Sequence, residues 1–262
     1  MSKKTVFISD ADSPSGKALI NRFSEARMDF VLNSQLDDKE WTDQLVALQA
    51  AGTNAIITHT DLCSRSDLAS MLDKAESQLG PIEVMIHNQM LSEPAAIETC
   101  NETSFLDIMQ GNAKSAFFCT QQVGKRMSTR ERGSIILVSS IHSEKPTGAA
   151  FSFSASQGAI KMLAHEASLF LGRHNVRVNL IEMGPVDGSD ALFPSEVSGL
   201  YESYRYKVPS AVLGTNKDLA ELAFFLAKDE PRYLNGADIR LDGGFLMHYL
   251  DNKMKKPAEE DR

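Results

Sequence analysis

Short apolar runs rich in β-branched residues alternate with longer amphipathic segments along nearly the whole chain of 262 residues. This alternation is typical of βαβ units, in which a helix crosses over between two parallel strands. Strands are predicted near residues 5–8, 30–33, 55–58, 83–86, 134–138, 177–181 and 239–241. We therefore expect an α/β fold with a doubly wound parallel sheet of about seven strands and helices on both faces.

The length of the chain is compatible with a single domain, which we place at residues 1–250. A segment at about 185–210 contains two prolines, several serines and three tyrosines, and it shows little helical or strand periodicity. Long connections of this kind usually serve as lids or binding loops. The last residues, 251–262, are almost all charged or polar, which predicts a solvated tail or a tail that clasps a neighbouring subunit.

Charge and cysteine content exclude several classes of function. A formal net charge of −8 without a basic stripe argues against a nucleic-acid partner, because such binding depends on clustered Lys and Arg. No apolar run has the length of a membrane span, so no membrane association is expected. Three cysteines without a CxxC spacing predict neither a disulfide framework nor a metal site, and they favour a cytoplasmic protein with reduced thiols.

One segment resembles the catalytic stretch of the short-chain dehydrogenase/reductase family, whose pattern is a serine followed thirteen residues later by Tyr-x-x-x-Lys. The serine is Ser140, but Phe153 stands at the tyrosine position and Gln157 at the lysine position. The resemblance extends over nearly the whole chain and implies a single-domain Rossmann-type fold. The other matching positions are Asp61, His87-Asn88-Gln89-Met90, Asn112, Met183-Gly184-Pro185, Asn235-Gly236 and Asp242-Gly243-Gly244.

The two substitutions remove the groups that carry the family's chemistry. Phe153 has no O–H to donate, and the carboxamide of Gln157 carries no charge that would lower the pKa of a neighbouring phenol. Ser140 and Asn112 remain at their family positions. His142 is the best candidate for a replacement acid or base, although a loop histidine without a catalytic role is nearly as good an interpretation.

Residues of the predicted lid are weaker candidates. Tyr201, Tyr204 and Tyr206 could turn into the pocket, and Asp187 and Asp190 stand at the start of the segment. We favour the alternative that the tyrosines make apolar lid contacts and keep their hydroxyls in water.

The resemblance also implies a nucleotide loop after the first strand, where the family has Gly-x-x-x-Gly-x-Gly. Here the loop runs from Asp10 to Gly16, with Pro14 and Ser13 inside it, and only the last glycine remains. Asp10 and Asp12 would repel the phosphates of a dinucleotide by about 1 to 4 kcal/mol at 4 Å. Alternatively, either carboxylate could cap the helix that follows.

Two further departures bear on the cofactor. The residues Asn33-Ser34-Gln35 after the second strand include neither an acid nor an arginine, so they do not distinguish NAD from NADP, although Asn33 and Ser34 could bond a sugar. Met90 replaces a glycine and would either fill the adenosine groove or pack into the core, and His87 is expected to be structural. We expect no NAD(P) binding or weak binding. The family positions that would contact it are Asp10, Ser13, Gly16, Asp61, Asn88 and Gly184.

Three functions are compatible with these residues. The first is a catalytically degenerate family member that binds a small molecule or a partner. The second is a non-redox enzyme acting through Ser140 and His142, since the segment 213–222 and the end at 243–245 resemble halohydrin dehalogenases, whose Ser-Tyr-Arg set is nevertheless missing here. The third is an NAD(P)-dependent oxidoreductase with an unusual proton donor. The identity of the ligand cannot be predicted.

Self-association is a separate expectation that the resemblance implies. Segments 104–127 and 149–172 correspond to the two helices that form a four-helix interface between subunits of the family. Their apolar residues include Phe105, Ile108, Phe117, Phe118, Leu163 and Phe170. We expect a symmetric homodimer or a homotetramer.

Overall fold

The computed structural model describes residues 3–187 and 204–248. All seven predicted strands are present, and every predicted end lies within two residues of the observed one. The strands are β1 (Thr5–Ile8), β2 (Asp29–Asn33), β3 (Ala55–Thr58), β4 (Ile82–His87), β5 (Gly133–Ser140), β6 (Val176–Met183) and β7 (Asp238–Leu241). They form one parallel sheet in the order β3-β2-β1-β4-β5-β6-β7, which confirms the predicted doubly wound α/β fold.

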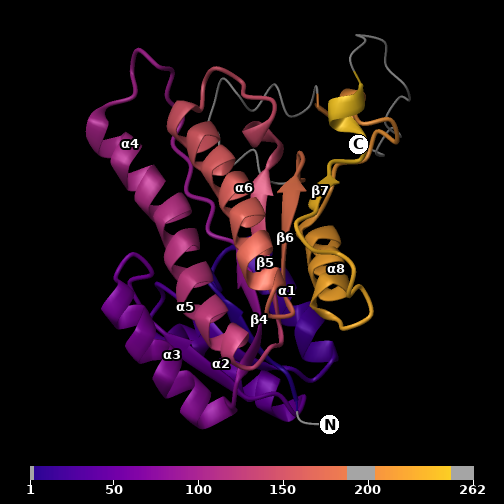
Figure 1. The fold of residues 1–262 in the computed structure, drawn as a ribbon. Helices are drawn as coiled ribbons and strands as arrows, with labels where there is room; N and C mark the ends of the chain where they lie inside the picture. The colour runs from indigo at the N-terminus through magenta and orange to yellow at the C-terminus, as the bar shows by residue number, and fades with distance from the viewer. Residues whose placement is uncertain (1–2, 188–203, 249–262) are drawn as a thin grey trace.

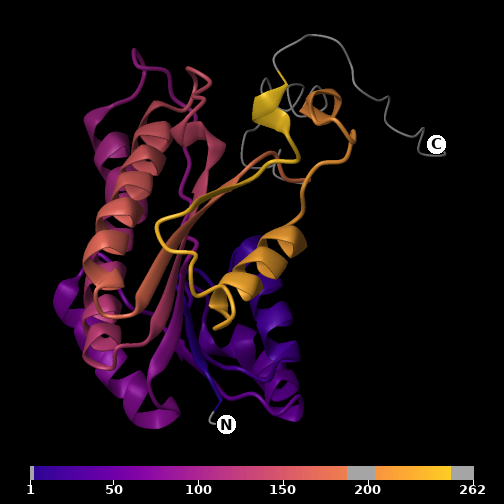
Figure 2. The ribbon, with the colours of Figure 1, turned by 45° about the vertical axis from the view of Figure 1, so that its right-hand side comes forward.

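Helices cover both faces of the sheet (Figure 1). They are α1 (Pro14–Glu25), α2 (Asp38–Ala50), α3 (Arg65–Leu79), α4 (Glu102–Ile108), α5 (Ser115–Thr129), α6 (Phe151–Gly172) and α8 (Asn216–Ala227). Short turns are the π-helix η1 (Met109–Lys114) and the 3-10 helices η2 (Ile141–Ser143) and η4 (Phe245–Met247). Helices α1, α2 and α8 pack on one face and α3, α5 and α6 on the other, and Figure 2 shows the sheet between the two layers.

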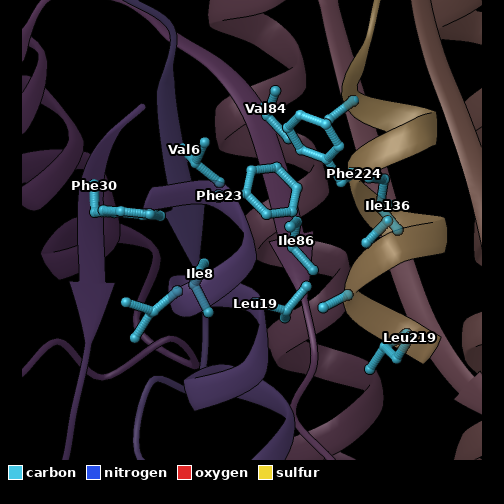
Figure 3. Close-up of a cluster of buried hydrophobic side chains, with 14 of the residues drawn as sticks. Val6, Ile8, Leu19, Phe23, Phe30, Val84, Ile86, Ile136, Leu219 and Phe224 are labelled. Carbon is cyan, nitrogen blue, oxygen red and sulfur yellow. The ribbon is translucent and has the colours of Figure 1, made fainter. Parts of the chain in front are cut away.

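Side-chain alternation along the strands builds the two cores. Val6 and Ile8 of β1 point to the face covered by α1 and α8, whereas Phe7 between them points to the face of α3 and α5. On the first face, the rings of Phe23 and Phe224 meet edge to face at 5.3 Å and join α1 to α8 (Figure 3). Because both faces are buried, the strands are continuous apolar runs in the sequence.

The strand order reverses at β1. The chain passes from β1 outward to β2 and β3, and then returns to place β4 on the other side of β1. Crossovers on either side of such a switch point diverge and leave a crevice beyond the carboxyl ends of the strands. Asp10 follows β1 and Asn88 follows β4, so both lie at this crevice.

Local interactions fix the helices that border the crevice. Ser13 is the N-cap of α1, since its side chain accepts a hydrogen bond from the N–H of Gly16, and Pro14 occupies the first turn. A Cβ atom on Gly16 would lie 2.1 Å from the carbonyl oxygen of Asp10, so only glycine fits there. Helix α8 begins with a capping box in which Thr215 and Asp218 bond each other's backbone N–H groups.

Several predicted features fall outside the described residues. These are Tyr201, Asp190, most of the lid at 188–203 and the tail at 251–262. Within residues 3–187 and 204–248, no helix has the length and apolar character needed to cross a membrane. In the same ranges all three cysteines are free, and no group of three metal-binding side chains comes together.

Candidate functional site

A cleft of about 700 Å³ opens at the carboxyl ends of the strands. The segments that line it follow β1, β4, β5 and β6 and include parts of α6, α8 and η4. Its lining contains many of the residues that the sequence singled out, among them Asp10, Ser13, Asn88, Ser140, His142, Phe153 and Gly184. The cleft therefore joins the predicted nucleotide loop to the predicted catalytic stretch.

Ser140 and His142 lie together at the end of β5. Ser140 is the N-cap of η2, and its Oγ accepts a hydrogen bond of 3.3 Å from the backbone N–H of His142. The imidazole of His142 meets the ring of Phe153 edge to face at 5.6 Å. Burial lowers the pKa of His142, because the charged imidazolium is disfavoured where water is excluded. His142 is therefore neutral near pH 7 and able to accept a proton.

Helix α6 presents Phe153, but not Gln157, to the cleft. Phe153 is one of the lining residues, whereas Gln157 is fully buried and does not line the cleft. The closest polar contact of the Gln157 side chain is 3.5 Å from Nε2 to the Oγ of Ser156, and within the described chain no hydrogen bond reaches its Oε1. Neither position thus supplies a hydroxyl or an ammonium group to the cleft.

Asn112 lies on the π-helix η1, the kind of irregular turn often found near functional sites. Its amide is occupied by protein groups: Oδ1 accepts from Leu91 N at 2.8 Å, and Nδ2 donates to Leu91 O at 2.8 Å and to Ser156 Oγ at 3.0 Å. The side chain is fully buried and does not line the cleft. Its role in this structure is to hold the segment after β4 against α6.

The nucleotide loop binds one of its own carboxylates. Oδ1 of Asp10 accepts hydrogen bonds of 3.2 Å from the N–H groups of Asp12 and Ser13. The expectation that Asp10 or Asp12 caps α1 is wrong, because Ser13 takes that position and Asp10 binds the preceding turn instead. Burial raises the pKa of Asp10, and the nearby charge of Asp12 adds to the shift, although the two N–H groups oppose it.

Asp12 turns away from the cleft toward β2. Its two carboxylate oxygens accept hydrogen bonds of 2.6 Å from Ser34 Oγ and Gln35 N. Ser34 Oγ also accepts from Trp41 Nε1 at 2.8 Å, and Asn33 is buried beside it. The possibility that Asn33 and Ser34 bond a sugar is not supported, because protein groups bury and occupy both side chains.

Among the remaining family positions, Asn88 and Met90 line the cleft and Asp61 does not. The Asn88 amide bonds the Ser9 hydroxyl, the backbone of Asp10 and the hydroxyls of the α1 N-terminus. Met90 lines the cleft and packs against the core of the α1 face, as the second of the two expectations for it stated. Asp61 is exposed and bonds Cys63 N, outside the cleft.

His87 is structural, as expected for a histidine at a strand end. It is fully buried, and its Nε2 lies 2.8 Å from Ser115 Oγ. Burial lowers the pKa of His87 to about 3, because no acidic group compensates the loss of hydration of the charged form.

Of the tyrosines of the predicted lid, Tyr204 lines the cleft with its ring edge-on to Phe245 at 5.1 Å, and Tyr206 is not among the lining residues.

Sequence reasoning missed a cluster of ion pairs around the buried Glu182, one helical turn beyond Gln157. Lys161 Nζ contacts the buried Glu182 at 3.0 Å and Asp238 at 3.2 Å, and it also pairs with Glu144. Burial works against the charged form, but these carboxylates outweigh it and raise the pKa of Lys161. Since Ser143 also bonds Glu182 at 2.7 Å, the cluster anchors the turn that carries His142. The only sequence signal was an acid inside the apolar run of β6.

Comparison with known proteins identifies the family. Residues 14–246 match the family model described as "Enoyl-(Acyl carrier protein) reductase". Glucose 1-dehydrogenase 2 of Bacillus subtilis (strain 168) is 24% identical over 249 residues, covering 94% of this chain and 95% of that protein. A "short-chain type dehydrogenase/reductase" of Picea abies is 29% identical over 196 residues, 74% of this chain and 72% of that protein.

Solved structures agree with the fold. The acetoin dehydrogenase of Enterobacter cloacae superposes with a TM-score of 0.82 over 98% of this chain and 99% of that one, at 24% identity. The chain therefore belongs to the short-chain dehydrogenase/reductase family, and it is oxidoreductase-like in fold.

Proposed function

We propose that this protein is a catalytically degenerate member of its family that binds a small molecule in the cleft without transferring hydride. The single observation that carries the proposal is the side chain of Phe153, which lies in the cleft beside His142 where the family has a proton-donating phenol. A phenyl ring can neither give nor take a proton. Gln157, buried behind it, supplies no charge to compensate.

The nucleotide loop supports the same conclusion. Phosphates bind at such loops through backbone N–H groups at a helix N-terminus. Here the N–H groups of Asp12 and Ser13 already bond the Asp10 carboxylate, whose charge would repel a phosphate by about 4 kcal/mol at 4 Å and a surface dielectric. Asp61, Asn33 and Ser34, which would flank an adenosine, do not line the cleft. A dinucleotide would therefore meet repulsion at the loop and would lack these contacts to its adenosine.

Titration with NADH and NADPH tests the proposal. Nicotinamide fluorescence and thermal unfolding are followed up to millimolar cofactor, and neither is expected to change. A cofactor at a hundred times its Kd would stabilise the fold by about 2.7 kcal/mol, so a large upward shift of the Tm contradicts the proposal.

A matched variant tests whether the charge of Asp10 prevents NADH binding or whether the assay fails to detect binding. Asp10→Gly removes the carboxylate and releases two N–H groups, so it is expected to bind NADH at least about tenfold more tightly than the natural chain. If the natural chain and the variant bind equally, Asp10 is not the group that excludes the cofactor.

A second candidate function rests on His142. It is neutral, lies in the cleft and is adjacent to Ser140, as a base for a non-redox elimination or isomerisation would require. The hydrogen bond between the two residues runs from the backbone of His142, so Ser140 is not activated by the imidazole through that bond. Turnover of a halohydrin or an epimerisable ketone that is abolished in His142→Ala would favour this candidate over the first.

We further propose that the protein associates through α5 and α6, as expected from the sequence. A groove of about 860 Å³ runs between these helices, and Phe117, Met162 and Phe170 line it with exposed apolar surface. Size-exclusion chromatography with light scattering is expected to give a dimer or a tetramer. Phe170→Glu should shift it toward monomer, whereas Phe225→Glu, at an exposed site on α8, should not.

A further inference from the structure

Asp10 brings to the cleft a charge of the opposite sign from the one that a phosphate-binding site requires. Asp10 lines the cleft at the carboxyl end of β1, at the switch point of the sheet. Its Oδ1 is occupied by two backbone N–H groups. Within residues 3–187 and 204–248, no Lys or Arg forms an ion pair with this carboxylate.

The loop N–H groups compensate this carboxylate only in part, because no cation pairs with it. A carboxylate withdrawn from water is normally paired with a cation, because its hydration is lost and not replaced. Asp12 cannot supply this compensation, since it carries the same charge and faces Ser34 and Gln35. A ligand that brings a positive charge to Asp10 would restore the missing interaction.

The walls next to Asp10 define the rest of such a ligand. Pro14, Met90 and Phe153 line the cleft with apolar surface, and Leu219 of α8 adds to it. Ser13, Ser15 and Asn88 also line the cleft, where their side chains bond one another. The cations that line the cleft, Lys145 and Lys207, come instead from the segments after η2 and before α8, in the described ranges.

On these grounds we propose that the cleft binds an organic amine whose ammonium group pairs with Asp10 and whose apolar body lies against Met90 and Phe153. This inference rests on the proposed function, because the ammonium would take the place of a dinucleotide phosphate. It names the ligand class of that site.

Three probes with one skeleton test the inference on the full chain: 2-phenylethylamine, 2-phenylethanol and 3-phenylpropanoate. Binding is measured by calorimetry and by chemical-shift changes of the amide signals. The amine is expected to bind at least about tenfold more tightly than the alcohol, and the carboxylate more weakly than either. Alcohol and amine affinities that agree within twofold, a preference for the carboxylate, or no amine binding at millimolar concentration would each overturn the inference.

Two matched variants test whether the ammonium group of the ligand pairs with Asp10. Asp10→Asn keeps an oxygen acceptor for the loop N–H groups and removes the charge, so it should reduce the amine-to-alcohol ratio about tenfold. Asp12→Asn changes net charge equally on the same loop, but its side chain faces β2, and the ratio should stay unchanged. A loss of equal size in both variants contradicts pairing with Asp10. If a variant fails to fold, the amine-to-alcohol affinity ratio of the natural chain still tests whether the cleft prefers an amine.

The same samples distinguish this inference from the function on which it rests. Amine selectivity together with an unchanged Tm in NADH supports both. If the amine-to-alcohol affinity ratio does not change in Asp10→Asn and NADH again leaves the Tm unchanged, only the inference of amine binding is overturned. Strong stabilisation by NADH or NADPH overturns the proposed function itself.

Discussion

Replacing the buried His87 should change how the stability of this protein depends on pH. His87 is fully buried, with its Nε2 at 2.8 Å from Ser115 Oγ, and its pKa is lowered to about 3. In the unfolded chain a histidine has a pKa of about 6.5. The folded state therefore keeps His87 neutral between these values, whereas the unfolded state takes up a proton as the pH falls.

The sign and size of the effect follow from these two values. Because the folded pKa is depressed, the contribution of His87 is fully present above about pH 6.5 and is lost as the pH falls toward 3. Proton uptake by the unfolded chain lowers the free energy of unfolding by about 2 kcal/mol between pH 7.5 and pH 5. The loss grows at lower pH until the folded histidine also becomes protonated.

Urea unfolding at pH 7.5 and pH 5 measures this difference directly. His87→Gln keeps a polar group near Ser115 and does not titrate, so its loss of stability between the two pH values should be smaller than that of the natural chain by about 2 kcal/mol. His59→Gln is the matched control. The His59 ring donates hydrogen bonds to the Asp38 carboxylate and the Ser34 carbonyl, which raise the pKa of His59, so this variant should not reduce the loss. Equal pH dependence in His87→Gln and the natural chain would refute the reasoning.

Other substitutions should act through single contacts, each measured as a change in the free energy of unfolding. Gly16→Ala places a Cβ atom 2.1 Å from the Asp10 carbonyl and should destabilise by at least about 1–3 kcal/mol, whereas Gly158→Ala in α6 meets no atom within 4 Å and should be neutral or stabilising. Thr215→Ala breaks the capping box of α8 and should cost about 0.5–2 kcal/mol. Asp12→Ala leaves Ser34 Oγ and Gln35 N without their acceptor and should cost about 1–3 kcal/mol. Unchanged unfolding curves in any of these destabilising variants would contradict the contact assigned to it.

The positions of the strands could be predicted from the sequence because their signal is local. The central strands β1, β4 and β5 contain short apolar runs, and burial on both faces requires such a run whichever neighbours the strand has. The family motifs also placed Ser140, His142 and Phe153 together, and all three line the cleft. The absence of a phenol at position 153 needed no structure, since it depends only on which residue stands there.

The partner of each polar side chain could not be predicted in this way. Asp10 and Asp12 are equivalent in the sequence, yet Asp10 faces the cleft while Asp12 bonds Ser34 and Gln35, more than twenty residues away. Lys161 meets Glu182 only because α6 packs against β6. The sequence by itself therefore determined the sheet, its crossovers and which side chains stand at positions 153 and 157. Tertiary packing decided which charges lie unpaired in the cleft, because hydrogen bonds and ion pairs depend on distances of a few ångströms between segments that are far apart in the chain.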